Sequence, residues 1–246
     1  MIVLITGATD GLGRGLARAL DDDGHTVLVH GRSEQRIADT LAELSDRSRS
    51  YRADLSSLAE VRRLADEVLA HERELDVLVN NAGIGTEGDR EESADGYELT
   101  FAVNYLAGYA LTRRLGDLPR RIVNVSSAGQ APIDFDDVML ERGYSGVQAY
   151  CQSKLAQIMF TFDLADAGVT AVALHPATYM PTKMVASPIS TLEEGIEATQ
   201  RLVTVPAEEI TGRYFYGTRE AHAHAQAYDA DARRELRELS ERLTAA

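Results

Sequence analysis

Tyr150 and Lys154 are the residues whose types and spacing point most directly to chemistry. They stand four positions apart, so on a helix both side chains project from one face. A lysine cation near a phenol favours the phenolate and lowers the tyrosine pKa from its ordinary value of about 10. A phenol tuned in this way can exchange a proton with an alcohol or a carbonyl near neutral pH. The same spacing occurs on many solvated helix faces, so the rest of the sequence has to decide between the two interpretations.

The elements that must position this pair alternate regularly along the chain. Short apolar runs predict buried strands, and longer amphipathic segments between them predict helices. This alternation is typical of an α/β fold, a Rossmann-type doubly wound parallel sheet of about seven strands with helices on both faces. We expect a single domain over residues 1–246, because no linker, repeat or low-complexity tract interrupts the chain. Strands are expected at residues 2–5, 26–30, 50–52, 77–80, 121–125 and 169–175, and helices at residues 12–22, 34–44, 58–71, 96–115 and 147–167.

Two segments break the alternation. Residues 130–146 are rich in aspartate and lie between a predicted strand and the helix of Tyr150, so we expect an insertion there. Residues 176–190 contain three prolines and follow a predicted strand at its carboxyl end. A long loop at that place is typical of a substrate lid, although a merely disordered loop is the alternative. We predict that residues 176–190 form a substrate loop.

Composition limits the partners and the location. The formal net charge is −14, which disfavours nucleic acid and anionic membrane surfaces as partners. Cys151 is the only cysteine, so no internal disulfide can form. The first residues lack the basic region of a signal peptide, and no apolar stretch approaches the ~20 residues of a membrane span. We therefore expect a cytoplasmic protein that acts on a small-molecule substrate.

No metal site is predicted. Asp134, Asp136 and Asp137 come without a histidine or a bidentate pattern, which is more typical of a solvated loop. His222 and His224 would point in different directions on a helix, and no third ligand accompanies them in the sequence.

A glycine-rich stretch follows the first predicted strand at once and opens the first predicted helix. Its glycines permit a tight turn and let backbone N–H groups approach a pyrophosphate at the helix N-terminus. The spacing is Gly-x-x-x-Gly-x-Gly rather than the Gly-x-Gly-x-x-Gly of the standard dinucleotide fingerprint. The cofactor-binding residues expected in this stretch are Thr6, Gly7, Thr9, Asp10, Gly11, Leu12 and Gly13.

With this spacing the chain resembles the short-chain dehydrogenase/reductases of the classical type. Residues 6–13 match their Thr-Gly-x-x-x-Gly-x-Gly motif, and residues 80–83 match their Asn-Asn-Ala-Gly signature. The resemblance covers essentially the whole chain and is similar in finer detail to the retinol dehydrogenase-like branch. It adds Asn81, Ala82 and Gly83 to the expected cofactor-binding residues. The family's catalytic tetrad falls on Asn104, Ser127, Tyr150 and Lys154.

The resemblance implies a role for each member of the tetrad. Tyr150 is the general acid for carbonyl reduction and the base for alcohol oxidation. Lys154 lowers the pKa of Tyr150 and hydrogen-bonds the nicotinamide ribose, so both residues also count among the cofactor-binding ones. Ser127 holds the substrate oxygen, in preference to its neighbour Ser126. Asn104 positions a water molecule that links Lys154 to solvent.

The end of the second predicted strand favours NADP(H) over NAD(H). An acidic residue there would accept hydrogen bonds from a ribose 2′-OH, but the position that the family uses for this acid holds Gly31. Arg32 follows and can bind a 2′-phosphate, with Ser33 adding a hydroxyl, although a solvated Arg32 is the alternative. The resemblance assigns Asp54 to the adenine amino group, and we place Leu55 beside it in the cofactor site. Asp54 is equally suited to cap the next helix.

The turn after the sixth predicted strand departs from the family pattern. Pro176-Ala177 stands where Pro-Gly is expected, and alanine restricts the backbone to negative φ. Pro176 and either Thr178 or Thr182 are expected to lie against the nicotinamide. The sequence leaves the choice between the two threonines open.

These observations give the hypothesis of an NADP(H)-dependent oxidoreductase that interconverts a carbonyl and an alcohol on a small, partly apolar organic substrate. The alternative is a catalytically silent NADP(H)-binding redox sensor, against which the intact tetrad argues. The extended branch of the family, which acts on sugar nucleotides, needs a longer chain. Both a monomer and a homo-oligomer (dimer or tetramer) stay open, because family dimers pair through the helix of Tyr150 and the 130–146 insertion can obstruct that face.

Overall fold

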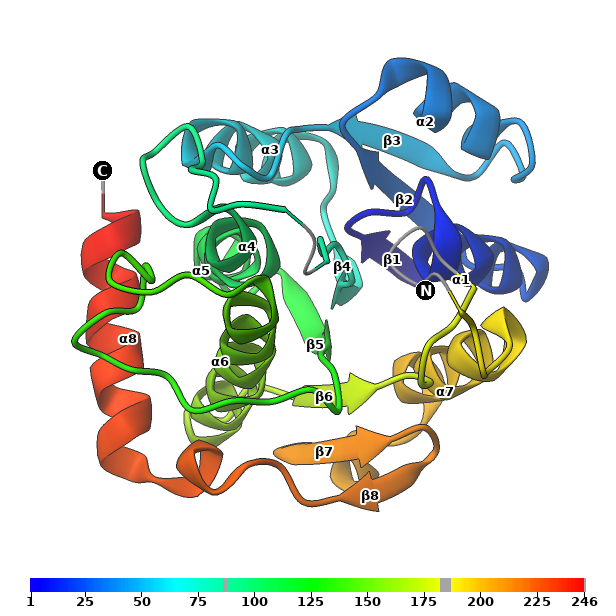
Figure 1. Ribbon diagram of the computed structural model, residues 1–246. Coiled ribbons are helices and arrows are strands. Elements are labelled where there is room, and N and C mark those ends of the chain that lie inside the picture. Colours follow the sequence, from blue (N-terminus) through cyan, green and yellow to red (C-terminus); the bar gives the residue numbers. More distant parts are fainter. Residues whose placement is uncertain (86–87, 182–186, 246) are drawn as a thin grey trace.

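A computed structural model describes residues 1–85, 88–181 and 187–245. Among these residues, eight strands form one sheet in the order β3-β2-β1-β4-β5-β6-β7-β8 (Figure 1). Strands β1 to β7 pair in parallel, and β8 pairs antiparallel with β7. The predicted doubly wound α/β fold is confirmed, with β8 as an additional antiparallel edge. The strands are β1 (Ile2–Ile5), β2 (Thr26–Gly31), β3 (Arg49–Arg52), β4 (Leu75–Asn80), β5 (Pro119–Val125), β6 (Ala171–His175), β7 (Arg213–Tyr216) and β8 (Arg219–Ala221).

The strand order reverses at β1, which pairs with β2 on one side and with β4 on the other. In sheets of this kind, ligands bind outside the carboxyl ends of the strands at the point of reversal. The ends of β1 and β4 therefore mark where a bound nucleotide is expected.

Helices cover both faces of the sheet (Figure 1). Successive strand residues point to opposite faces, so Leu4 packs under α3, α5 and α6 while Ile5 packs under α1 and α7. The central strands β1, β2, β4, β5 and β6 are largely apolar and buried on both faces, as parallel sheets require. The α-helices are α1 (Gly11–Asp22), α2 (Glu34–Leu41), α3 (Leu58–His71), α4 (Leu99–Phe101), α5 (Ala107–Leu115), α6 (Gly146–Asp166), α7 (Leu192–Thr204) and α8 (Ala230–Thr244).

The helices begin at side chains that accept hydrogen bonds from otherwise free backbone N–H groups. Ser145 caps α6, and Asp229 caps α8. Thr191 and Glu194 form a reciprocal capping box at the start of α7. No element after residue 175 is among the predicted ones, so α7, β7, β8 and α8 are new. The Thr-x-x-Glu pattern at 191–194 is the sequence signal that predicts the first of them.

The helix predicted over residues 96–115 is shorter and is interrupted. It starts at α4, continues through a π-helix at Ala102–Leu106 and ends with α5. Single π-turns inside α-helices occur frequently at functional sites. The π-helix contains Asn104, one of the predicted tetrad.

Helix α8 packs along α6, the helix of Tyr150, at the left of Figure 1. Two ion pairs join the helices: Arg237 contacts Asp163, and Arg233 contacts Asp166 at 2.7 Å. At its far end, α8 reaches Tyr97, whose hydroxyl donates to the carbonyl of Leu243 at 3.0 Å. No helix in the described ranges is both long and apolar enough to cross a membrane.

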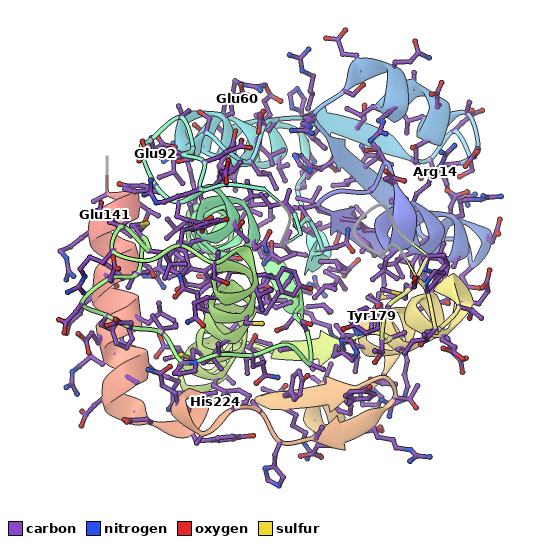
Figure 2. The ribbon with its side chains drawn as sticks, in the orientation of Figure 1. Arg14, Glu60, Glu92, Glu141, Tyr179 and His224 are labelled. Atoms are coloured by element: carbon purple, nitrogen blue, oxygen red, sulfur yellow. The ribbon has the colours of Figure 1, made fainter. Side chains whose placement is uncertain are left out.

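Residues 130–145 lack regular structure, as expected for an insertion, and α6 begins at Gly146, yet the segment is firmly anchored. Ile133, Val138 and Leu140 are buried in the main core. The backbone of Ile133 exchanges two hydrogen bonds with the side chain of Gln226. Figure 2 shows Glu141 beside α8, at the outer edge of this segment. This insertion, called the wall segment below (residues 130–145), therefore packs into the core through Ile133, Val138 and Leu140 rather than forming a wholly solvated loop.

Candidate active site

The glycine-rich turn joins β1 to α1 at the carboxyl edge of the sheet. Gly7 has φ +67°, in the left-handed region that side chains rarely adopt. A Cβ on Gly13 would lie 2.3 Å from Gly7 O and 2.5 Å from Asn81 Nδ2, so a side chain cannot fit there. Asp10 caps α1 by accepting from Gly11 N at 3.0 Å. The turn thus brings the N-terminus of α1 to the end of β1, where a helix dipole favours anionic phosphates.

Hydrogen bonds tie this turn to residues 81–83 after β4. Thr6 Oγ1 accepts from the backbone N–H groups of Asn81 and Ala82, both at 3.0 Å, and donates to Val79 O at 3.3 Å. Asn81 Nδ2 donates to Thr6 O at 2.8 Å. The Thr6 hydroxyl is therefore occupied inside the protein, and it braces two motifs that were each expected to contact the cofactor.

His30 is a residue of this region that the sequence analysis does not identify. Its Nδ1 accepts from Gly7 N at 3.1 Å, and its Nε2 lies 3.2 Å from Ala53 O, to which it can donate. Burial lowers the pKa of His30 to about 4, so the ring is neutral at physiological pH and keeps Nδ1 as an acceptor. The imidazole thus fixes the glycine-rich turn to β2 and β3. Only the register of β2 against β1, which the local sequence does not encode, brings it there.

The end of β2 has the features expected of an NADP(H) site. A Cβ on Gly31 would lie 2.6 Å from Thr9 Cγ2, so this position excludes an acidic side chain unless Thr9 moves. Arg32 is exposed, and it makes no hydrogen bond or ion pair with the residues that the structure describes. Ser33 caps α2 by accepting from Arg36 N at 3.5 Å, so its hydroxyl is partly engaged.

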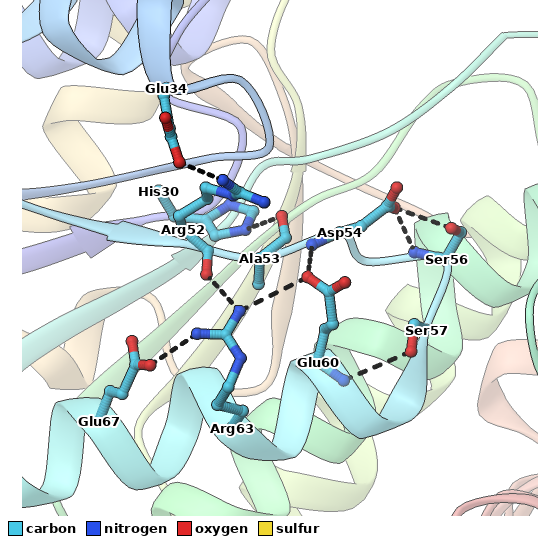
Figure 3. Close-up of polar contacts among 10 residues, drawn as sticks. All are labelled: His30, Glu34, Arg52, Ala53, Asp54, Ser56, Ser57, Glu60, Arg63 and Glu67. Carbon is cyan, nitrogen blue, oxygen red and sulfur yellow. Dashed lines mark hydrogen bonds and ion pairs between the residues drawn. The ribbon is translucent and has the colours of Figure 1, made fainter.

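Asp54 lies at the end of β3, and it does not cap the next helix. Its Oδ1 accepts from the backbone and the hydroxyl of Ser56, at 2.9 and 2.8 Å (Figure 3). Ser57 is the residue that caps α3, by accepting from Glu60 N. Burial alone would raise the pKa of Asp54, but the Ser56 hydrogen bonds and the charge of Arg32 outweigh it and hold that pKa below its usual value. Asp54 is thus a charged acceptor close to Arg32.

Ser127 and Tyr150 meet at the end of β5. The Ser127 hydroxyl is close enough to the phenol to lower its pKa, and Gly129 N donates to Ser127 Oγ at 3.0 Å. A Cβ on Gly129 would contact both side chains, which shows how closely the loop passes over them. Ser126 instead donates its hydroxyl to Lys154 O at 2.6 Å in the interior. The structure therefore puts Ser127, not Ser126, beside the phenol.

Lys154 lies below the tyrosine, with Nζ 5.6 Å from the centre of the Tyr150 ring. It is 4% exposed, and burial lowers its pKa to about 7. Burial also raises the pKa of Tyr150, and the nearby Ser127 hydroxyl offsets only part of that rise. The expected lowering of the Tyr150 pKa is therefore wrong in direction, because desolvation of the phenol is the largest cause of its shift.

Asn104 is held by its side chain. Its Oδ1 accepts from Ile84 N at 2.8 Å, and its Nδ2 donates to Ile84 O at 3.2 Å and to Ser153 Oγ at 3.1 Å. A Cβ on Gly83 would lie 3.4 Å from both Asn104 Oδ1 and Lys154 Nζ. The absence of a side chain at Gly83 thus leaves space in front of these two residues. Both N–H donors of the Asn104 amide are engaged, and its Oδ1 accepts one hydrogen bond and can accept a second from a water molecule.

The turn after β6 has its own polar cluster. Thr178 Oγ1 lies 2.9 Å from His175 Nε2 and 2.6 Å from the hydroxyl of Tyr216. Burial and the nearby Lys154 lower the pKa of His175 to about 4, so this ring is neutral. Pro176 follows directly on β6, and Thr182 lies outside the described residues. The Thr178 hydroxyl therefore already has two hydrogen-bond partners inside the protein, His175 at the end of β6 and Tyr216 on β7.

The carboxyl ends of five strands thus gather the predicted residues at one edge of the sheet. Most of them come from β1, β2, β3, β4 and β5, and α6 adds the tyrosine and the lysine. Leu55 and Ala82 line a small cavity together with Asn104. In the described part of the chain, no group of three histidine, cysteine or acidic residues is arranged to hold a metal ion.

This edge suits a nicotinamide dinucleotide. The glycine-rich turn leaves no side chain between its backbone and a pyrophosphate, with Leu12 buried beneath it. Gly83 leaves open space before Lys154, and the Lys154 ammonium has three hydrogens, of which the protein binds two. A nicotinamide dinucleotide has an anionic pyrophosphate and a polar ribose at the nicotinamide. The backbone N–H groups of the turn suit the pyrophosphate, and the remaining N–H of Lys154 suits the ribose.

Comparison with known proteins agrees with this geometry. The model of the short chain dehydrogenase family matches residues 1–192. Mouse retinol dehydrogenase 13 is 34% identical to the chain, and the match covers 98% of the chain and 83% of that protein. An uncharacterised protein from Mycobacterium paratuberculosis has a crystal structure that superposes with a TM-score of 0.83 at 30% identity, covering 100% of this chain and 93% of the other.

A third comparison concerns a protein with its cofactor. The RhlG/NADP active-site complex of Pseudomonas aeruginosa superposes with a TM-score of 0.71 at 25% identity, over 87% of this chain and 93% of RhlG. The fold, the grouped tetrad and the family match lead to one conclusion. The chain belongs to the short-chain dehydrogenase family, in its retinol dehydrogenase-like branch, and it is an NAD(P)-dependent oxidoreductase acting on alcohol groups.

Proposed function

We propose that this enzyme uses NADP(H) to interconvert a carbonyl and an alcohol on a small, partly apolar organic substrate, with Tyr150 as general acid and base. The observation that carries the proposal is the meeting of the Tyr150 and Ser127 side chains beside Gly129, with Lys154 Nζ 5.6 Å from the centre of the Tyr150 ring. Two hydroxyl groups in that arrangement can both bind one substrate oxygen.

The residues divide the chemistry as follows. When bound, the nicotinamide supplies the hydride for reduction or accepts it for oxidation. Tyr150 gives its proton to the substrate oxygen as the carbonyl becomes an alcohol, and Ser127 donates a hydrogen bond to the same oxygen. Because burial raises the pKa of Tyr150, the phenol stays protonated before the reaction and can act as the acid. Lys154, when charged, stabilises the phenolate that results.

The preference for NADP(H) is supported by the end of β2. An arginine can form charge-assisted hydrogen bonds with a phosphate, and Arg32 is exposed there with no partner among the described residues. Gly31 offers no carboxylate to repel the phosphate. RhlG, with a similar fold, is a protein seen with NADP.

The partly apolar character of the substrate is supported by two exposed apolar side chains in the segment that follows β6. Tyr179 and Ile189 are exposed by 61% and 73%, and Ile189 N donates to Tyr179 O at 3.0 Å. Tyr179 lies between the end of β6 and α7 in Figure 2. Relatives of the chain are named retinol dehydrogenases, whose alcohol substrate is largely apolar. A surface of this kind suits an apolar group attached to the reacting carbon.

The experiment compares the wild type with Tyr150→Phe in NADPH oxidation against a panel of aldehydes, ketones and quinones. We expect the variant to bind NADPH with little change, measured by fluorescence titration, and to lose more than about 99% of turnover, since proton transfer contributes 10²–10⁴-fold. Tyr97→Phe, which removes a hydroxyl bonded to α8, is the control and should keep its turnover. Turnover in Tyr150→Phe equal to that of the wild type would refute the mechanism. NADPH binding by the wild type without turnover on any substrate would favour the redox sensor.

A further inference from the structure

The ammonium of Lys154 has few partners for a buried charge. Nζ donates to the backbone carbonyl of Val125 at 2.9 Å and to Oε1 of Gln157 at 3.0 Å. An ammonium has three hydrogens and no acceptor, so these two bonds leave one N–H for a ligand. Nζ also lies 3.4 Å from the place where a Cβ on Gly83 would stand, on the side where space is open.

The titratable groups around Lys154 provide no negative charge. Tyr150 faces it from the same helix, and burial keeps this phenol protonated. His175 faces it from β6, and its ring is neutral because burial and Lys154 lower its pKa to about 4. Burial lowers the pKa of Lys154 to about 7, and neither of these neighbours carries a negative charge that would offset it. The charged form of Lys154 thus depends on the two carbonyl dipoles that it contacts.

Gln157 is itself held in place. It is 3% exposed, on α6 three residues after Lys154, and its backbone carbonyl accepts from Thr161 Oγ1 at 2.8 Å. Thr161 Oγ1 accepts in turn from Asn124 Nδ2 at 2.8 Å, and Asn124 Oδ1 accepts from Asn80 Nδ2 at 2.9 Å. This buried chain of hydrogen bonds fixes the backbone of α6 at Gln157 to β5 and β4, and from there the side-chain Oε1 accepts from Lys154 Nζ.

We propose that Gln157 is a positioning residue of the active site, whose side-chain carbonyl holds the Lys154 ammonium in its charged form and leaves its third N–H for the nicotinamide ribose. The role in catalysis rests on the proposed function, in which a charged Lys154 stabilises the Tyr150 phenolate. The effect of Gln157 on the protonation of Lys154 does not rest on the proposed function, because it follows from contacts within the protein alone.

The chain allows a direct test, because Lys154 and Lys183 are its only lysines. Lysine labelled with ¹³C at Cε gives two side-chain signals in the cofactor-free protein, and Lys183→Arg assigns them. In the wild type we expect the Lys154 signal to titrate far below that of an ordinary lysine. In Gln157→Met, loss of one charge-assisted hydrogen bond should lower its midpoint by about one pH unit. In Gln157→Glu, a carboxylate in place of the amide should raise the midpoint by about one unit or more.

Gln152→Met is the matched control. Gln152 is also a buried glutamine of α6, but its Nε2 donates to Val138 O in the wall segment and it does not contact Lys154. This variant should leave the Lys154 midpoint where it is in the wild type. If Gln157→Met does not fold, as judged by circular dichroism, Gln157→Asn replaces it, and the midpoints should follow the order Glu above Gln above Asn. A midpoint that does not change in the Gln157 variants would overturn the proposal.

Kinetics test the catalytic part separately. The pH at which NADPH-dependent turnover falls as Lys154 loses its proton should move down in Gln157→Met and up in Gln157→Glu, in parallel with the NMR midpoints. If the midpoints move but the turnover profile does not, Gln157 does not act on the reaction through Lys154 and the catalytic part is refuted. A failure of the proposed function would show itself differently, as full turnover in Tyr150→Phe.

Discussion

The cofactor side and the substrate side of the site are built in different ways. On the cofactor side, Thr6 and Asn81 join the ends of β1 and β4 by hydrogen bonds between side chains and backbone, and the glycines of the turn lie so close to the neighbouring chain that no side chain fits. On the substrate side, hydrogen bonds from side chains hold the catalytic loop. Tyr214 on β7 and Gln130 in the wall segment both donate to the carbonyl of Ser127, at 3.0 Å each.

The cofactor side and the substrate side should therefore differ in how well they tolerate substitutions. A backbone contact at 2–3 Å cannot adjust to an added methyl group, because the main chain on both sides is fixed by the sheet. A carbonyl that accepts two side-chain hydrogen bonds retains one of them when the other is removed. We therefore expect single changes on the cofactor side to have large effects, and single changes among the side chains that hold the Ser127 loop to have small ones.

The largest effect is expected from Gly13→Ala. The new Cβ would lie 2.3 Å from Gly7 O, so the turn or α1 must shift. We expect a loss of roughly 2 kcal/mol in the free energy of unfolding, which lowers the melting temperature by roughly 4–8 °C. NADPH binding measured by calorimetry should fall below detection. Gly143→Ala, in the wall segment, meets no atom within 4 Å and should change neither quantity. Equal melting temperatures for Gly13→Ala and Gly143→Ala would contradict the expectation that the cofactor side tolerates substitution poorly.

An intermediate effect is expected from Arg32→Ala. Loss of charge-assisted hydrogen bonds to the 2′-phosphate should weaken NADPH binding by about 10–100-fold and leave NADH binding within about 2-fold. The ratio of the two dissociation constants is the quantity to measure. Arg114→Ala removes an exposed arginine that is paired with Asp66 at 2.6 Å, away from β2, and should leave the ratio unchanged. Equal losses for both nucleotides would refute the assignment of Arg32.

The smallest effect is expected from Tyr214→Phe. This change removes one of the two donors to Ser127 O and keeps the ring in the core. We expect kcat to fall by about 2–5-fold, in line with one neutral hydrogen bond of about 0.5–1 kcal/mol, with the NADPH dissociation constant unchanged. Tyr228→Phe, whose hydroxyl accepts from Ala223 N outside the site, is the control. A loss above a hundredfold would show that the substrate side is as intolerant as the cofactor side.

The contrast between local contacts and contacts among distant segments also explains which parts of the structure the sequence predicts. The strand–turn–helix units before residue 175 follow from apolar periodicity and glycine spacing, which are local signals. The π-helix at 102–106 and the role of His30 depend on how α4 packs on α6 and how β2 aligns with β1, and no local signal encodes either. The direction of the Tyr150 pKa shift was also out of reach, because it depends on how far the site is desolvated.

After residue 175 the chain has fewer local signals. Helix α8 has only three fully buried residues, Ala232, Leu236 and Ser240, so its apolar stripe is narrow. The short strands β7 and β8 are recognisable only through their pairing with β6 and with each other. The Gln157–Lys154 contact has the i,i+3 spacing of any helix, and only burial gives it significance.

Helix α8 has a consequence for how the protein reaches this structure. The contacts that seat it join residues far apart in the chain: Tyr105 meets Ser240 over 135 positions, and Tyr97 meets Leu243 over 146. Contacts of such separation form slowly, because long loops must close before any of them can stabilise the chain. We expect the last turns of α8, which make these contacts, to dock after the nucleotide-binding strands have paired. The helix that carries Tyr150 and Lys154 would then acquire its complete outer cover late, and activity would appear only when α8 has docked.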